Sequence, residues 1–116
     1  MRPALLLTTL ALLAIALAGC SGSDTSNTAP GDNQSVSIKD FNFNPSTVNL
    51  NKGSTLQWTN DGQQKHSVTI HSPAGTEVKT QDLTNGQKTT YTFNDAGNFH
   101  VVCRFHSSME MSITVK

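Results

Sequence analysis

The residues with the most distinctive chemistry in this 116-residue chain lie close to its C-terminus. Cys103, His106 and Met109 occupy one short stretch between two apolar segments that alternate in the manner of β-strands. A loop this short must turn back between its strands, so its side chains can converge on one point. A thiolate, an imidazole and a weakly bound thioether together form a set of ligands for a soft transition metal.

A second imidazole is needed to complete that set, and His66 is the residue that can supply it. His66 has the same strand parity as Val68, which directs its ring toward the interior of the domain, and it follows a polar turn. His71 and His100 have the opposite parity, so we expect both rings on solvated outer faces. The expected site therefore joins a strand in the middle of the chain to a loop near its end.

The softness of these donors favours copper over the other common metals. Thiolate and thioether stabilise Cu(I), and imidazole serves both oxidation states of copper. Structural zinc sites use four Cys and His ligands in paired spacing, and iron–sulfur clusters need about four cysteines. We expect one copper ion, with the ligands His66, Cys103, His106 and Met109. Because three strong ligands and one weak ligand leave no open position for a substrate, we expect Cu(I)/Cu(II) exchange and no enzyme activity.

The start of the chain has the layout of a secretory signal. Ala4 to Ala18 is an apolar run of Ala, Leu, Ile and Thr, shorter than the roughly 20 residues of a membrane span, and small residues separate it from Cys20. We expect residues 1–19 to be a signal peptide and Cys20, which resembles the cysteine of a bacterial lipobox, to carry a lipid. An uncleaved anchor, or an ordinary signal peptide in which Cys20 is incidental, are the alternatives.

Residues 20–34 hold no large apolar residue after the cysteine, which predicts a flexible tether. If Cys20 is acylated, Cys103 is a lone thiol in an oxidising compartment, where an unpaired cysteine indicates a role such as metal binding. If Cys20 is not acylated, the two cysteines could form a disulfide. Removal of Arg2 with the signal leaves seven basic against eight acidic residues, without the basic patch of a nucleic-acid-binding protein. We expect an extracytoplasmic, membrane-anchored protein with no nucleic-acid partner.

From Val36 onward, short stretches of alternating apolar and polar residues recur between turn residues. Turns are expected at 51–53, 60–62 and 95–97, and one irregular strand within loops is expected over residues 73–86. Seven or eight strands at this spacing, without helical periodicity, predict an all-β sandwich or barrel for the domain of residues 35–116.

The spacing Cys103-x-x-His106-x-x-Met109 resembles the copper loop of the cupredoxins, with the short form found in amicyanin rather than the longer form of plastocyanin. Further matches are Phe41-x-Phe43-x-Pro45, Gly53, Trp58-x-Asn60, His66-Ser67-Val68 and the tail Met109-x-Met111-x-Ile113-x-Val115. The resemblance covers residues 36–116. It implies a two-sheet Greek-key β-sandwich and a blue type 1 copper site, with Met109 as axial ligand and His106 as the ligand nearest to solvent.

Two positions depart from the cupredoxin pattern. Ser67 stands where the family commonly has Asn, and its hydroxyl is expected to make a similar bracing hydrogen bond. Met111 stands where many relatives have Gly, so Met111 and Glu110 are alternatives to Met109 as the axial ligand. We favour Met109 because it has the spacing of the family.

The expected function is that of a membrane-anchored blue copper protein that carries single electrons. The expected partners are redox proteins such as c-type cytochromes or membrane oxidoreductases, and the expected state is a monomer. A periplasmic copper buffer or donor is the alternative, supported by the thioethers and imidazole of one loop. A metal-free interaction domain is a third possibility, which Cys103→Ala would leave unaffected. Arg104 and Phe105 either shape a docking surface around His106 or simply fill the loop.

Overall fold

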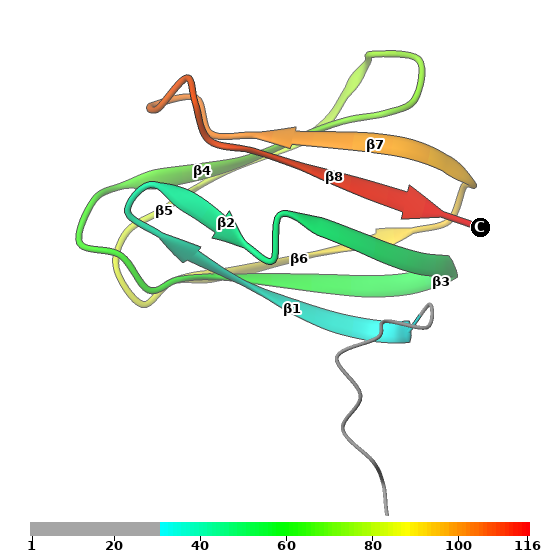
Figure 1. Cartoon of the computed structure of the whole chain (residues 1–116), viewed down its shortest axis with the longest axis horizontal. Helices are drawn as coiled ribbons and strands as arrows, with labels where there is room; N and C mark the ends of the chain where they lie inside the picture. Colours follow the sequence, from blue (N-terminus) through cyan, green and yellow to red (C-terminus); the bar gives the residue numbers. More distant parts are fainter. Residues whose placement is uncertain (1–30) are drawn as a thin grey trace, which may run out of the picture.

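The computed structural model describes residues 31–116, which contain eight β-strands and no helix (Figure 1). In chain order the strands are β1 (Gly31–Lys39), β2 (Asn42–Asn44), β3 (Thr47–Asn60), β4 (His66–His71), β5 (Glu77–Leu83), β6 (Lys88–Phe93), β7 (Gly97–Val102) and β8 (Glu110–Val115). The predicted signal peptide, Cys20 and most of the predicted tether lie outside the described residues. Within residues 31–116 there is no helical segment of the length and apolarity that a bilayer crossing requires.

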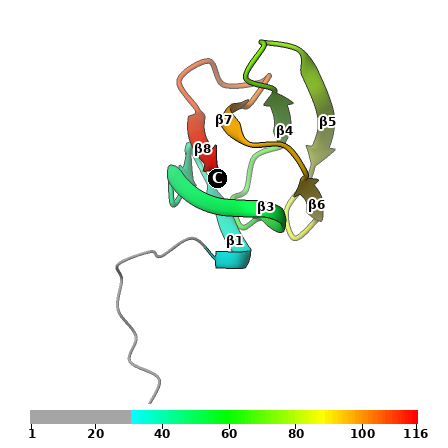
Figure 2. The same ribbon diagram turned by 90° about the vertical axis from the view of Figure 1, so that its right-hand side faces the viewer.

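The strands form two packed layers that share β3. The strands follow the order β2-β1-β3-β8-β7-β4-β5, and β6 pairs with β3. Seen end-on in Figure 2, one layer holds β1, β3 and β6, and the other holds β8, β7, β4 and β5. The predicted all-β, two-sheet Greek-key sandwich is confirmed.

β3 belongs to both layers because it bends sharply in its middle. Its first arm, residues 47–50, pairs in parallel with β8, and its second arm, residues 54–59, pairs antiparallel with β6. Gly53 lies between the arms with φ of 88°, a conformation that glycine adopts without steric cost. The turn predicted at residues 51–53 is therefore a bend inside one extended element, and Figure 1 shows the two arms running in opposite directions.

One segment is longer than its sequence predicted. β1 begins at Gly31, so residues 31–34, which we assigned to the tether, form the start of a strand paired with β3. Backbone pairing with β3 organises this polar stretch, which lacks alternating apolar residues. β5 is one strand between two loops, and its pairing with β4 shifts register between Ile70 and His71, so the irregular strand predicted over residues 73–86 is confirmed. Only Leu83 of β5 is buried, so the strand lacks the alternation that would reveal it.

The hydrophobic core lies between the two layers and extends to one end of the sandwich. Its largest fully buried side chains include Trp58, Phe93 and Ile70, and the same core contains Cys103 and Met109. Full burial of an aliphatic or aromatic side chain contributes about 1.5–3 kcal/mol to folding. Two of the predicted metal ligands, Cys103 and Met109, are therefore part of the hydrophobic core.

Candidate metal centre

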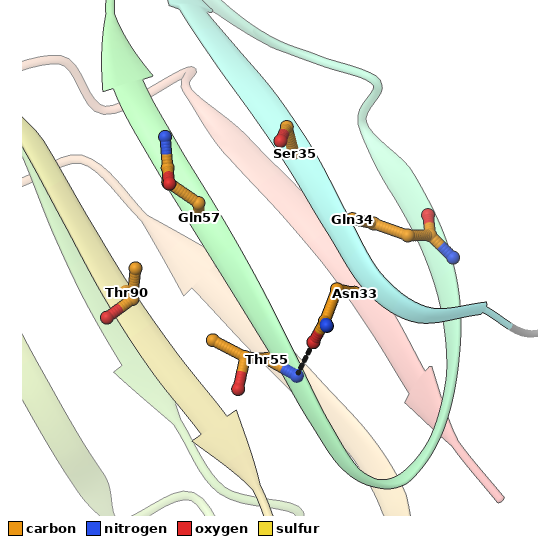
Figure 3. A pocket seen from close by; sticks show the side chains of 6 residues that line it. All are labelled: Asn33, Gln34, Ser35, Thr55, Gln57 and Thr90. Carbon is orange, nitrogen blue, oxygen red and sulfur yellow. Dashed lines mark hydrogen bonds between the residues drawn. The ribbon is translucent and has the colours of Figure 1, made fainter.

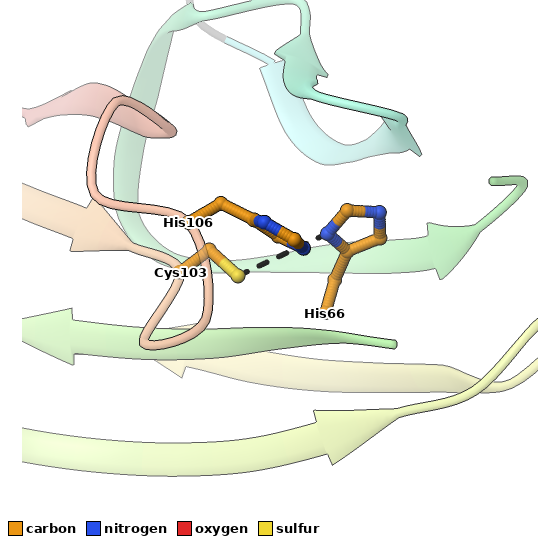
Figure 4. A group of neighbouring side chains, drawn as sticks. All are labelled: His66, Cys103 and His106. Carbon is orange, nitrogen blue, oxygen red and sulfur yellow. Dashed lines mark hydrogen bonds between the residues drawn. The ribbon is translucent and has the colours of Figure 1, made fainter. Parts of the chain in front are cut away.

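Three of the four predicted ligands meet at the end of the sandwich where β4 begins and β7 ends. His66, Cys103 and His106 each offer one donor atom, and these atoms lie within 4.8 Å of one another (Figure 4). The Sγ of Cys103 is 3.9 Å from Nδ1 of His66. One ion can bind both atoms, since metal–sulfur and metal–nitrogen bonds are about 2.0–2.3 Å long. The predicted convergence of the strand ligand and the loop ligands is confirmed for these residues.

His66 is held rigidly because it is the first residue of β4 and is fully buried. Its backbone is paired with Leu83 of β5. Its Nε2 atom lies 2.7 Å from Oδ1 of Asp40, in the segment between β1 and β2. An ionised carboxylate can only accept a hydrogen bond, so Nε2 carries the proton and Nδ1 presents its lone pair toward Cys103.

Cys103 is buried at the start of the loop between β7 and β8, and within the described part of the chain its thiol is free. Its Sγ accepts a hydrogen bond of 3.3 Å from the backbone N–H of Ser67, which fixes the position of the sulfur. The hydroxyl oxygen of Ser67 accepts a second hydrogen bond, of 2.8 Å, from the backbone N–H of Arg104. The bracing role predicted for this hydroxyl is confirmed.

His106 is half-buried, more exposed than His66, as expected for the ligand nearest to solvent. Its ring makes an edge-on contact with Phe41, with 4.8 Å between the centroids. Its Nε2 atom is buried and has no hydrogen-bond partner among the described residues. A buried polar atom without a partner costs free energy, and a bound metal would remove that cost. The residues therefore fit a metal ion.

The candidates for the axial ligand differ in their surroundings. Met109 is 1% exposed at the end of the loop, where its backbone N–H donates to the carbonyl of His106. The sulfur of Met111 accepts a hydrogen bond of 3.3 Å from the indole N–H of Trp58. The carboxylate of Glu110 is exposed and lies 3.1 Å from Nε2 of His100. Because both alternatives have other partners, Met109 stays the predicted axial ligand.

The two histidines predicted to lie outside the site do so. His100 is half-exposed on β7 and faces Glu110, and His71 is half-buried at the end of β4. Neither belongs to the group formed by His66, Cys103 and His106.

The loop also presents an aromatic side chain to solvent. Phe105 is 45% exposed, and the cationic groups of Lys65 and Arg104 lie 5.2 and 5.7 Å from the centre of its ring. Arg104 also donates a 2.8 Å hydrogen bond to Asp82 of β5. Phe105 is thus held at the surface next to His106 in the chain. A docking surface around His106 was one of the two roles expected for Arg104 and Phe105.

Asp40 is the residue at this site that sequence reasoning missed. Its carboxylate accepts hydrogen bonds from His66 and from the backbone N–H groups of Gln63 and Gln64, at 2.7 and 3.1 Å for the two amides. The hydrogen bond from His66, followed by that from Gln63, holds the pKa of this carboxyl below its ordinary value. No local pattern links residues 40 and 66, so only the fold reveals the contact.

A polar hollow elsewhere on the domain is unrelated to these residues. It measures about 400 Å³, lies on the outer face of β1, β3 and β6, and contains none of the predicted ligands (Figure 3). Its lining is Asn33, Gln34, Ser35, Thr55, Gln57 and Thr90. Such uncharged side chains offer no ligand set for a soft metal.

A β-sandwich in which one buried cysteine and two histidines converge at a C-terminal loop defines the class of type 1 copper proteins. Residues 9–115 match the family model of the cupredoxin-like domain, and the chain belongs to that family. The cofactor that this family and this donor set imply is one copper ion.

Solved structures agree with this assignment of the fold. A purple cupredoxin from Nitrosopumilus maritimus matches with a TM-score of 0.63 and 20% identity, over 71% of this chain and 98% of that chain. Amicyanin from Paracoccus versutus matches with a TM-score of 0.65 and 23% identity, over 76% of this chain and 85% of that chain. The Cu(I) form of an amicyanin mutant has a TM-score of 0.66 and 20% identity, over 76% and 86% of the two chains.

Proposed function

We propose that this protein is a one-electron carrier that uses a single type 1 copper ion. The observation that carries the proposal is the convergence of His66, Cys103 and His106, with their donor atoms within 4.8 Å of one another. When bound, the copper ion supplies the exchange between Cu(I) and Cu(II). His66, Cys103 and His106 would hold it strongly, and Met109 would supply the weak axial bond.

The surrounding residues hold these ligands in one arrangement, which suits electron transfer. His66 is fixed by β4, and Cys103 is fixed by hydrogen bonds from Ser67 and to the carbonyl of Met109. Ligands that are fixed in this way move little when the charge of the site changes, so little energy is spent on reorganisation. His106, which is half-buried, gives electrons their shortest route to the surface.

The proposed location is the outer face of a bacterial membrane, with a lipid on Cys20 as the anchor. The apolar run before Cys20 and the small residues beside it support this location. Partners of the proposed carrier are redox proteins such as c-type cytochromes or membrane oxidoreductases, which it would meet as a monomer. Labelling with a radioactive fatty acid, lost in Cys20→Ala, tests the anchor.

A visible spectrum of the copper-loaded protein after oxidation with ferricyanide tests the proposed function. We expect an intense thiolate-to-Cu(II) band that disappears on addition of ascorbate and is absent from Cys103→Ser. Ser72→Ala, at a half-buried position in the turn between β4 and β5 and outside the site, is the control and should keep the band. A colourless protein, or one that binds zinc in preference to copper, would contradict the proposal.

Paired methionine variants test the axial ligand. A thioether favours Cu(I) when compared with a harder ligand, but any donor stabilises the more highly charged Cu(II) more than an apolar side chain does. Met109→Leu removes the weak axial donor altogether, so we expect a higher reduction potential. Met111→Leu removes a sulfur that is already engaged by Trp58, so we expect an unchanged potential. The opposite pattern would assign the axial role to Met111.

Copper handling, the alternative function, makes a different prediction about exchange. A buffer or donor must release copper readily, whereas the imidazole of His66 and the thiol of Cys103 are almost fully buried. We therefore expect the folded protein to lose Cu(I) to a chelator over hours. Exchange within minutes, without unfolding, would favour copper handling.

A further inference from the structure

The carboxylate of Asp40 is hydrogen-bonded to His66, although Asp40 is not one of the three grouped ligand residues. It accepts hydrogen bonds from Nε2 of His66 at 2.7 Å, from N–H of Gln63 at 2.7 Å and from N–H of Gln64 at 3.1 Å. The side chain of Asp40 is 23% exposed, and the His66 side chain is fully buried. The carboxylate of Asp40 therefore links His66 to the turn before β4, which contains Gln63 and Gln64.

The turn between β3 and β4 is shaped around this carboxylate. A Cβ atom on Gly62 would lie 2.2 Å from Oδ1 of Asp40, so only glycine leaves room for the carboxylate at that position. The N–H of Gly62 donates a 2.9 Å hydrogen bond to the side chain of Asn60, whose own amide group donates to the carbonyl oxygens of Gln64 and Leu83. Asn60 is fully buried, so these contacts fix the turn.

The charges around His66 are few. Among residues 31–116, Asp40 is the one acidic group in contact with its ring, while Phe41 and His106 pack against it at centroid distances of 6.2 and 4.9 Å. Among the described residues, the nearest basic side chain in sequence, Lys65, faces Asp82 and Phe105 instead. The negative charge of Asp40 therefore acts on His66 without a paired cation.

We propose that Asp40 is a positioning residue that holds His66 with its Nδ1 atom toward the metal and lowers the reduction potential of the bound copper. This inference rests on the proposed copper function. A carboxylate that accepts the proton of a ligating imidazole makes that imidazole a stronger donor. Cu(II) carries one more positive charge than Cu(I), so a stronger donor and a nearby negative charge stabilise Cu(II) more.

Asp40→Asn is the variant that separates charge from shape. The amide oxygen of Asn can still accept the hydrogen bond from His66, but the negative charge is lost. We expect the affinity for Cu(II) relative to Cu(I) to fall about tenfold, which raises the potential of a one-electron couple by about 59 mV. Asp40→Ala, which also removes the hydrogen bond, is expected to raise the potential further.

Two further variants exclude a general effect of charge or folding. Asp61→Asn also removes one negative charge, from the turn between β3 and β4 that Asp40 contacts. Asp61 contacts Ser37 and not a ligand, so the potential of this variant should equal that of the unchanged protein. Gly62→Ala keeps every charge and displaces the Asp40 carboxylate, so its potential should rise as in Asp40→Asn. Gly62→Ala thus tests the inference even if Asp40→Asn fails to fold.

A measurement on the metal-free protein provides a readout that does not depend on copper. Long-range ¹H–¹⁵N NMR spectra distinguish the two neutral tautomers of a histidine. We expect the proton of His66 on Nε2 in the unchanged protein, and a mixture of tautomers in Asp40→Ala.

The outcomes separate this inference from the proposed function. Absence of copper binding by the unchanged protein would overturn the proposed function, while the NMR result would still decide whether Asp40 positions His66. Copper binding with equal potentials in the unchanged protein, Asp40→Asn and Gly62→Ala would overturn the effect of Asp40 on potential and leave the electron carrier intact. Equal shifts of the reduction potential in Asp40→Asn and Asp61→Asn would show that Asp40 acts only as one of several negative charges.

Discussion

His66 is fully buried at the start of a strand, whereas His106 is half-buried in the loop that follows β7. His66 forms the strand half of the site. It is braced from three sides, by β5, by Asp40 and by the turn before β4. Residues 103–109 form the loop half of the site. The shape of this loop depends on the hydrogen bonds that Cys103, Ser67 and Met109 make within and beside it. The two imidazoles therefore differ in rigidity and in access to solvent, although one ion would bind both.

The largest expected effect of this difference concerns removal of each imidazole. His66→Gly and His106→Gly should both lose the charge-transfer band of the copper-loaded protein. Added imidazole should restore the band in His106→Gly, because that position is partly open to solvent, and should fail in His66→Gly, where the cavity is closed. Titration with imidazole followed by visible absorption measures this. Equal recovery in both variants would show that access to the two positions is the same.

Removal of the metal should loosen the loop half more than the strand half. Ligand binding to the folded state alone stabilises it by about 4 kcal/mol at a thousand times the Kd. We expect the copper-free protein to unfold at a correspondingly lower denaturant concentration. Hydrogen exchange should accelerate over residues 103–109 and change little in β4. Uniform acceleration in both segments would remove the distinction between the two halves.

Ser67→Ala should weaken the connection between the two halves. The variant leaves the backbone N–H of Arg104 without its acceptor, and loss of such a part-buried hydrogen bond costs about 0.5–1.5 kcal/mol. Denaturant unfolding of the copper-free protein measures the loss. Ser108→Ala, at an exposed position of the same loop, should change the free energy of unfolding by less than about 0.5 kcal/mol. Equal effects of the two variants would mean that the hydroxyl of Ser67 does not brace the loop.

The smallest expected effect is on the acid sensitivity of the strand half. In the metal-free protein the lowered pKa of Asp40 means that the unfolded chain binds a proton at a higher pH than the folded protein does. This carboxyl therefore stabilises the fold above its ordinary pKa of 3.8, and the contribution disappears as the pH falls through the lower folded value. The free energy of unfolding should fall less steeply in acid for Asp40→Asn. A steeper fall would contradict a lowered pKa of Asp40 in the folded protein.

The sequence predicted most strands because apolar residues alternate where one face of a strand is buried. The alternation is plain in β4 and β8, whose inward residues include Val68 and Ile113. It is absent from β5, which is mostly exposed, and from the polar residues at the start of β1, so only their pairing with β4 and β3 identifies them as strands. Burial leaves a periodic pattern in the sequence, and backbone pairing alone does not.

The residues of the site also divide into those that the sequence predicts and those that only the fold brings together. The chemical identity of Cys103, His106 and Met109, and their placement in one short loop, were determined by the sequence alone, because neighbours in the chain are neighbours in space. The approach of His66, the hydrogen bond from Trp58 to Met111 and the hold of Asp40 on His66 were decided only by the tertiary structure. These contacts join residues 26 or more positions apart, and such distances along the chain are closed only when the two layers pack.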